Sequence, residues 1–427
     1  MALRAFRILR GLRVHFLLTV TRTCQICSGS LTRLVDFGRQ PICNRYLSSL
    51  DQTEYRHELV LSQCRGDGLL QLARPWPSEE VRPRLPWISY QEPEPHLDDV
   101  VDRIIRLPGV SRGTLIAGLS YKDYSVLDRL EQRGFRNIWK VALSELGLDV
   151  PGAGMESIQQ VLTPAIGESL RASRGAPGVI VVRHLIEHSN SVGAVLQALQ
   201  SWGDPAAHFV FEVPDSEDTF RKLDVSTLWE EHVSYFTEFT LRRAFVPHGL
   251  NLLEVVRYPY ALEDCLVAFV MSSAPASLSA ADPDSLDAEV ALGTGFRNGL
   301  EDLTRRCHRE LKKVRERGET VALLGAGHRA ATFLNLLSLG DMLSCVIDDD
   351  PRKTGLYMPG NQLPILSSAH LMATHPSLCL LAASPDSEPA VLKRNEAYLA
   401  AGGRMASIYP RSSRAWAPLF ADAFAPV

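Results

Sequence analysis

Apolar runs separated by helix-forming segments predict a doubly wound α/β sheet in the middle of the chain. Four of these runs have the length and composition of buried strands, at residues 113–118, 137–143, 179–182 and 208–213. Strands that alternate with helices favour a parallel sheet. Two further apolar runs, at 250–256 and 265–270, predict a terminal hairpin of the same sheet.

A second unit of the same kind is predicted after residue 287. A charged amphipathic helix is expected over about 290–317, and the run VALLGAGHRAATFLNLL then follows the order of strand, tight turn and helix. The segment LSCVIDDD predicts a strand that ends in acids, and CLLAASP around Cys379 predicts another. This order is that of a Rossmann-like fold.

Proline-rich and small-residue stretches divide the chain into units. Prolines break regular structure over 75–95, a helix is predicted at 98–107, and SSAPASLSAADPDSLD at 272–287 has the composition of a linker. The predicted units are a basic extension (1–22), a small N-terminal domain (23–73), a linker (74–98), a central Rossmann-like domain (99–271), a second linker (272–287), and a helix with a C-terminal Rossmann-like domain (288–427).

Composition is that of an ordinary globular chain, with 427 residues, 45% hydrophobic and 22% charged residues, and a net charge of −4. Without a basic face or a long run of one charge, nucleic acid and membrane are not expected as partners. The basic stretch at 1–22 is expected to be a disposable extension, with a transit-like peptide as the alternative, because its apolar run at 14–20 is too short to span a bilayer. The eight scattered cysteines favour a cytoplasmic protein with a metal site.

A cysteine pair near the start predicts half of a zinc site. Cys24 and Cys27 form a CxxC turn, and Cys64 begins a second half in which Asp67 stands where another cysteine is expected. Because aspartate oxygen also binds zinc, we expect Cys24, Cys27, Cys64 and Asp67 to form the site, with Cys43 as a spare thiol. The alternative is a degenerate knuckle that holds no metal.

The stretch TLWEEHVSYF at 227–236 concentrates a histidine, two carboxylates and three aromatic residues directly after a predicted strand end. Strand ends of this kind bind ligands in α/β sheets, so His232, beside Glu231, is the first candidate for proton transfer. The alternative is a partly buried helix start. His184 and His188 are four residues apart and share a face if that segment is helical, and His188 is the better candidate for the site.

Two turns after predicted strands are candidate ligand-binding loops. The first has only Gly118, followed by Leu119 and Ser120, and Lys140 stands near the place of the acid that usually holds ribose. The second has Gly325 and Gly327, which predict a phosphate site at the following helix N-terminus, or else a simple tight turn.

Several segments together resemble one family, the zinc-containing sugar C-methyltransferases of deoxysugar and natural product biosynthesis. The resemblance covers the chain from Thr23 onward and rests on QPICNRYL, EVPD, EEHVSYF, GAGHRA and DDDPRKTGLYMPGNQLPI. It implies an α/β protein with a small N-terminal zinc-knuckle domain, a central Rossmann-like methyltransferase domain that binds S-adenosylmethionine, and a C-terminal Rossmann-like domain that helps to hold a nucleotide-linked keto sugar.

The resemblance also implies roles for individual residues. His232 would be the base that removes a proton beside the sugar ketone, and the enolate would then take the methyl group. Glu231, His188 and Tyr90 would support it, Gly118 and Ser120 would contact the cofactor, and the substrate would be held by Gly325, Gly327, His328, Asp348 and Lys353.

Departures from the family pattern cluster on the cofactor side, where the turn after Gly118 lacks its acid and glycines and the second strand lacks its ribose acid. Other departures lie elsewhere in the motifs. Trp229 stands in place of a tyrosine, Glu230 in place of a frequent histidine, and YPYALEDC at 258–265 lacks the usual His-Gly-Gly. The alternative function is therefore that of a relative that no longer uses S-adenosylmethionine and either does base-catalysed carbanion chemistry, such as isomerisation, or only binds substrate. The oligomeric state and the methylated position do not follow from the sequence.

Overall fold

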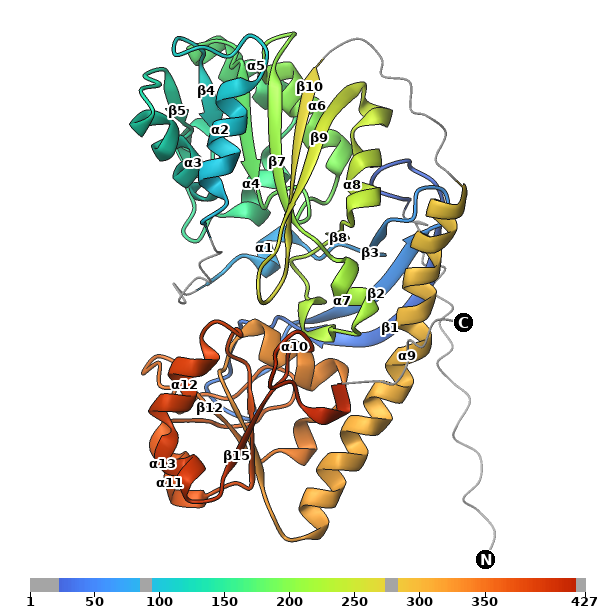
Figure 1. Ribbon diagram of the computed structural model, residues 1–427, viewed down its shortest axis with the longest axis vertical. Coiled ribbons are helices and arrows are strands. Elements are labelled where there is room, and N and C mark those ends of the chain that lie inside the picture. The colour runs from blue at the N-terminus through green and yellow to red at the C-terminus, as the bar shows by residue number, and fades with distance from the viewer. Residues whose placement is uncertain (1–22, 85–93, 273–282, 420–427) are drawn as a thin grey trace, which may run out of the picture.

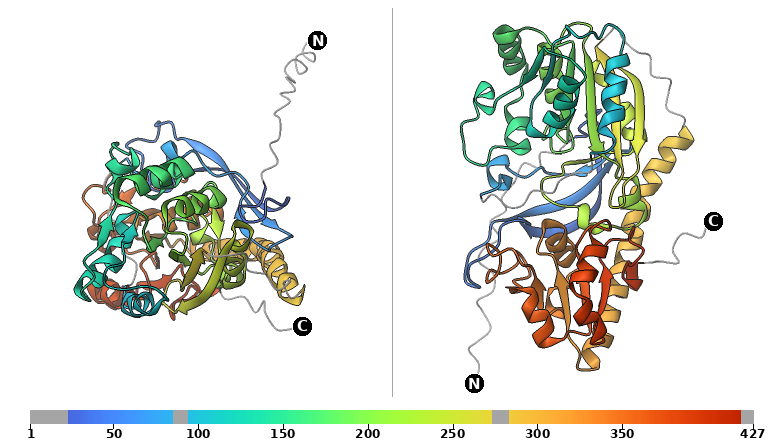
Figure 2. Two further views of the ribbon diagram at one scale, coloured as in Figure 1. Left: turned by 90° about the horizontal axis from the view of Figure 1, so that it is seen from above. Right: turned by 60° about the vertical axis from the view of Figure 1, so that its left-hand side comes forward.

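The computed structural model describes residues 23–84, 94–272 and 283–419. Figure 1 shows the central α/β unit at one end of the long axis, the C-terminal unit at the other, and the N-terminal strands at the junction between them. The same order is seen in the turned view of Figure 2. None of the helices in the described ranges combines the length and the apolar character needed to cross a membrane. The predicted extension at 1–22 lies outside the described residues.

The N-terminal unit is an antiparallel sheet whose last strand comes from far along the chain. Its strand order is β1-β2-β3-β8. The strands are β1 (Leu31–Pro41), β2 (Arg56–Cys64), β3 (Leu70–Leu72) and β8 (Ser234–Tyr235). Leu70 pairs with Tyr235, so part of the predicted 227–236 stretch completes this sheet. That stretch is therefore not a helix start.

The central sheet has the order β5-β4-β6-β7-β10-β9, with the first four strands parallel and the last two forming the predicted hairpin. The strands are β4 (Ile116–Gly118), β5 (Ile138–Lys140), β6 (Val179–Arg183), β7 (His208–Pro214), β9 (Leu250–Tyr258) and β10 (Cys265–Ser272). Apolar side chains of β6 and β7 are buried on both faces, as expected for a sheet covered by helices on both sides.

The helices of this unit include α2 (Leu97–Arg106), α3 (Tyr121–Gln132), α4 (Met155–Val161), α5 (Pro164–Arg174), α6 (Val192–Trp202), α7 (Glu217–Arg221) and α8 (Glu238–Ala244). Short 3₁₀ turns lie at Leu143–Leu146, Val225–Thr227 and Val246–His248. Within the predicted linker at 74–98, a four-residue helix, α1 (Ser78–Val81), forms after the buried Trp76.

The C-terminal unit is a parallel sheet of order β13-β12-β11-β14-β15. Its strands and helices are β11 (Val321–Leu324), α10 (His328–Leu336), β12 (Cys345–Ile347), β13 (Ile365–Leu366), α11 (Ser368–Thr374), β14 (Leu378–Leu381), α12 (Glu388–Arg394), α13 (Glu396–Ala400) and β15 (Arg404–Ser407). Two 3₁₀ turns lie at Gly340–Met342 and Ala417–Leu419. The predicted fold class, with two Rossmann-like units, is confirmed.

A single long helix, α9 (Pro283–Glu316), runs along the side of the molecule beside all three units (Figure 1). It begins inside the predicted linker at 272–287, which is therefore shorter than expected. Its buried stripe contains Phe296, Leu303 and Leu311. Where it meets the N-terminal sheet, a Cβ at Gly293 would lie 2.3 Å from Gln63 Oε1, so this close approach requires glycine.

Candidate functional site

The zinc ligands predicted from the sequence lie together. The sulfurs of Cys24, Cys27 and Cys64 and a carboxylate oxygen of Asp67 are all within 4.8 Å of one another. The Cys24 thiol donates to Asp67 Oδ2 at 2.9 Å, and the Sγ atoms of Cys27 and Cys64 are 3.5 Å apart. Backbone N–H groups also point at all three sulfurs, at 3.3–3.4 Å. This donor set fits tetrahedral zinc, because such N–H groups stabilise the thiolate form that binds the metal.

Cys43 lies elsewhere, so Asp67 rather than Cys43 completes the cluster. The Cys43 Sγ is 3.1 Å from Thr332 Oγ1 on α10, and its backbone N–H donates to Glu230 Oε1 at 2.7 Å. The residue therefore joins the N-terminal unit to the two other units.

Replacing Asp67 with cysteine is expected to tighten zinc binding by about tenfold or more, because a fourth thiolate is a softer and more strongly bound ligand. Competition with a chromophoric zinc chelator measures the change. The Cys43→Ser variant is the control and should keep the zinc content of the wild type. Equal affinity in Asp67→Cys and the wild type would contradict the assignment of Asp67 as a ligand.

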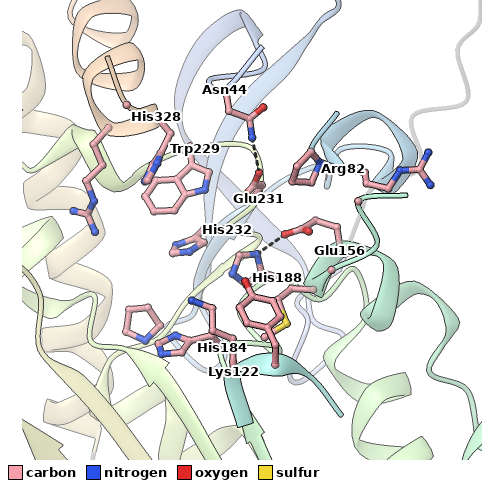
Figure 3. Close-up of a pocket in the computed structure, with 18 of the residues that line it drawn as sticks. Asn44, Arg82, Lys122, Glu156, His184, His188, Trp229, Glu231, His232 and His328 are labelled. Atoms are coloured by element: carbon pink, nitrogen blue, oxygen red, sulfur yellow. Dashed lines mark hydrogen bonds and ion pairs between the residues drawn. The ribbon is translucent and has the colours of Figure 1, made fainter. Parts of the chain in front are cut away.

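A cavity of about 990 Å³ lies where the three units meet (Figure 3). The N-terminal unit contributes Asn44, the central unit contributes His188 and His232, and the C-terminal unit contributes His328 at the start of α10. Because each unit supplies part of the wall, a ligand in this cavity contacts all three.

His232 is a neutral histidine in the wall of this cavity. Its ring stacks at a tilt on Trp229, with centroids 4.1 Å apart, and meets the edge of His188 at 4.8 Å. Burial lowers the pKa of His232 well below its ordinary value, and the neighbouring positive groups lower it further. Within the described ranges, no side chain makes a hydrogen bond to its ring nitrogens. An unprotonated imidazole of this kind accepts a proton from a bound ligand.

Glu231 does not contact His232, although the two are adjacent in sequence. The chain turns at this point, so the two side chains point in different directions, and Asn44 Nδ2 donates to Glu231 Oε1 at 3.4 Å. The carboxylate instead lies near His188 and Glu156 of α4, with their donor atoms within 4.8 Å of one another. Sequence reasoning missed Glu156, because no motif marks it. Tyr90 lies outside the described residues.

His184 and His188 do not share a helix face. His184 has a positive φ of 52°, and α6 begins only at residue 192, so the spacing of four does not bring the two together. His184 forms ion pairs with Glu187 at 3.2 Å and Glu212 at 3.1 Å. Burial alone lowers the pKa of His184, but these carboxylates outweigh it and raise the pKa to about 10. His184 is therefore a charged structural residue.

Glu212 is the centre of a buried ionic network at the carboxyl end of β7. It pairs with Arg183 at 2.7 Å, with His184, and with His96 at 3.3 Å. Burial disfavours its charged form, but Arg183 and the two histidines outweigh burial and hold the pKa of Glu212 well below its ordinary value. The network fixes the ends of β6 and β7 against α2.

The expected cofactor turn has its backbone donors satisfied from within. Both the Leu119 and Ser120 N–H groups donate to Asp123 Oδ2 at 2.8 Å, and Ser120 caps α3. A Cβ at Gly118 would lie 2.6 Å from the Asp123 side chain. Neither Gly118 nor Ser120 is part of the cavity lining, so their predicted contact with a cofactor stays a prediction. At the end of β5, Lys140 pairs with Asp128 and Glu131.

The cavity nevertheless continues across the starts of α3 and α4. Its lining there includes Tyr121, Lys122, Gly154 and Met155. A cationic, an aromatic and a thioether side chain suit the carboxylate, the adenine ring and the sulfonium region of S-adenosylmethionine, respectively. These residues therefore fit the cofactor through side chains rather than through a glycine loop.

On the opposite wall, α10 presents its N-terminus to the cavity. Gly327 precedes the helix without a side-chain cap, and a Cβ there would meet nothing within 4 Å. Burial lowers the pKa of His328 to about 3, so its ring is neutral. Lys353 Nζ donates to Ala326 O at 2.9 Å and pairs with Asp348 at 3.1 Å.

Asp348 shapes the turn rather than lining the cavity. Its Oδ2 accepts the Ala326 N–H at 2.9 Å, while Gly325 has a φ of 105°, which favours glycine. Of the five predicted substrate residues, the cavity lining includes Gly327, His328 and Lys353. An uncapped helix N-terminus with a lysine beside it is an arrangement that binds phosphate.

Three domain families match the chain in order. Residues 24–81 match a zinc-binding domain, residues 122–255 match a methyltransferase domain, and residues 280–410 match the C-methyltransferase C-terminal domain. A relative from Streptomyces niveus, the C-methyltransferase NovU, is 23% identical over 394 residues, which is 89% of this chain and 94% of the relative.

Two solved structures are similar to part of the chain. The 1,6-didemethyltoxoflavin-N1-methyltransferase of Burkholderia thailandensis, solved with S-adenosylhomocysteine, is 14% identical, with a TM-score of 0.30 over 42% of this chain and 78% of that one. The magnesium protoporphyrin IX methyltransferase of Synechocystis PCC 6803 is also 14% identical, with a TM-score of 0.29 over 42% of this chain and 82% of that one.

Proposed function

We propose, from the premise that the chain belongs to the zinc-containing C-methyltransferase family, that it methylates the carbon beside the ketone of a nucleotide-linked sugar. The observation that carries this proposal is the neutral, buried His232 in a cavity that is also lined by the N-terminus of α10. A base and a phosphate-binding helix end thus line one cavity.

Proton removal is the step assigned to His232. A ring nitrogen accepts the proton from the carbon beside the ketone, the C–H electron pair forms the enolate double bond, and the negative charge passes to the carbonyl oxygen. Trp229 and His188 hold the ring in place on two sides. When bound, S-adenosylmethionine supplies an electrophilic methyl group for the carbon that has lost its proton.

Substrate binding is assigned to the C-terminal unit. The N–H groups at the start of α10 and the Lys353 ammonium favour the negative charge of a diphosphate. A diphosphate held there places the attached sugar in the cavity that also contains His232.

The test is a panel of nucleotide-linked keto sugars offered with methyl-labelled S-adenosylmethionine to folded, zinc-loaded protein. We expect label on a carbon beside the ketone, identified by NMR of the product. Label on oxygen or nitrogen, or no transfer to any sugar of the panel, would contradict the proposal.

A second candidate function is proton exchange or isomerisation without methyl transfer. The observation that favours it is the occupation of the Leu119 and Ser120 N–H groups by Asp123, which removes the backbone contacts of an ordinary cofactor turn. Calorimetric titration with S-adenosylhomocysteine separates the two functions. Binding favours methyl transfer, whereas sugar deuterium exchange in protein that binds no S-adenosylhomocysteine favours the second candidate.

A further inference from the structure

Three side chains from separate segments converge on one wall of the cavity, beside His232. They are Glu156 in the first turn of α4, His188 in the loop between β6 and α6, and Glu231 in the loop before β8 (Figure 3). One donor atom from each lies within 4.8 Å of the others. Two carboxylates and an imidazole are thus brought together in the interior.

The contacts within this cluster are those of ligands around a shared point. His188 Nδ1 lies 3.2 Å from Glu156 Oε1, yet this buried nitrogen has no hydrogen bond of acceptable geometry to any described residue. The Glu156 side chain is only 9% exposed. Carboxylate oxygens and an imidazole nitrogen gathered in this way are a ligand set that suits a divalent metal ion.

The two carboxylates of the cluster also favour a cation between them. Two ionised carboxylates in a low-dielectric wall repel each other unless a positive charge lies between them. Asn44 gives Glu231 only a neutral donor, at 3.4 Å.

We propose that Glu156, His188 and Glu231 bind one divalent first-row transition-metal ion, with Mn²⁺ as its representative. Oxygen and imidazole ligands suit such ions, whereas the thiolates of the N-terminal cluster select zinc. In an octahedral site with metal–ligand distances of about 2.1 Å, donor atoms are about 3 Å apart when adjacent and about 4.2 Å apart when opposite. The three ligand atoms lie within 4.8 Å of one another, so they need to move only slightly closer together to reach these distances.

The role of this ion rests on the proposed function. The ring centroids of His188 and His232 are 4.8 Å apart. A ligand that contacts both rings therefore has its reacting carbon near His232 and its carbonyl oxygen near the ion. The ion then stabilises the negative charge that develops on the carbonyl oxygen as His232 removes the proton.

The test is a titration with Mn²⁺ of protein that retains its zinc but has been freed of other metal ions. Electron paramagnetic resonance measures the free Mn²⁺. We expect one Mn²⁺ per chain in the wild type and at least tenfold weaker binding in Glu156→Gln and Glu231→Gln. The matched control is Glu230→Gln, because Glu230 is the neighbouring carboxylate but accepts the Cys43 N–H instead, and this variant should bind Mn²⁺ as the wild type does. Thermal melting and zinc content establish that each variant is folded.

Absence of Mn²⁺ binding in the wild type, or equal binding in the wild type and in both cluster variants, would overturn the proposal. An infrared band of a protonated carboxylic acid in Mn²⁺-treated wild type would also overturn the proposal, if the band is absent from Glu231→Gln. Such a band would mean that a proton, and not a metal ion, neutralises the cluster. His232→Asn should retain Mn²⁺ binding, so failure of the base assignment and failure of the metal site are distinguishable.

Discussion

Replacing His232 with asparagine is expected to lower solvent deuterium exchange at the carbon beside the ketone by about 10²- to 10⁴-fold, the usual contribution of a general base. Asparagine has a similar shape and keeps polar atoms in the wall, but it accepts no proton near neutral pH. The measurement is NMR of a nucleotide-linked keto sugar in deuterated buffer, with methyl transfer followed in parallel.

The comparison variant for this prediction is His370→Gln. His370 lies on α11 of the C-terminal unit and is not part of the cavity lining, so exchange should equal that of the wild type. Unchanged exchange in His232→Asn, in protein that melts at the wild-type temperature, would show that another group is the base.

Replacing Glu212 with glutamine is expected to lower the free energy of unfolding by about 3–5 kcal/mol, because it leaves the buried charges of Arg183 and His184 without their shared carboxylate. Urea unfolding measures the change. The control is Glu254→Gln on β9, whose half-exposed pair with Arg103 should contribute less than about 1 kcal/mol. Equal losses in the two variants would contradict the central place of the network.

The same network predicts how stability depends on pH. The pKa of His184 rises from 6.5 to about 10 on folding, so its contribution is complete below pH 6.5 and is lost as the pH rises toward about 10. The pKa of Glu212 falls on folding, so its contribution is present above pH 4.5 and is lost as the pH falls further. Stability from this network is therefore greatest between about pH 4.5 and 6.5. His184→Gln should flatten the alkaline decline, and an unchanged alkaline decline would argue against this charge.

Strands β6 and β7 were predictable because each is a short apolar run that is buried on both faces. Residues 179–182 and 208–213 correspond closely to β6 and β7, and the GAG turn correctly marks the start of α10. Long-range pairing was not predictable. Nothing in the local pattern at 234–235 indicates that these residues join a sheet built from the first part of the chain.

The site was predictable only where a local motif marks it. His232 and the predicted zinc ligands stand in short, dense segments, and the structure places His232 in the cavity lining and the zinc ligands in one cluster. The spacing of His184 and His188 was misleading, because a left-handed residue at His184 interrupts any helix. Glu156 and Glu212 carry no motif, since their importance comes from charges that folding brings together. Asp123 does have a local signal in the sequence, because it stands three residues after Ser120, which is the spacing of a capping box. This capping box explains why the cofactor turn needs no further glycines.

The place of β8 in the N-terminal sheet has a consequence for synthesis on the ribosome. Strands β1 to β3 leave the exit tunnel early, but the edge of β3 can pair only when Tyr235 has also been made. Until then the nascent chain carries an open strand edge, which is the kind of surface that other chains and chaperones recognise. The zinc knuckle forms from residues up to 67 alone, so metal capture can precede closure of the sheet and hold this part of the nascent chain together while the rest is translated.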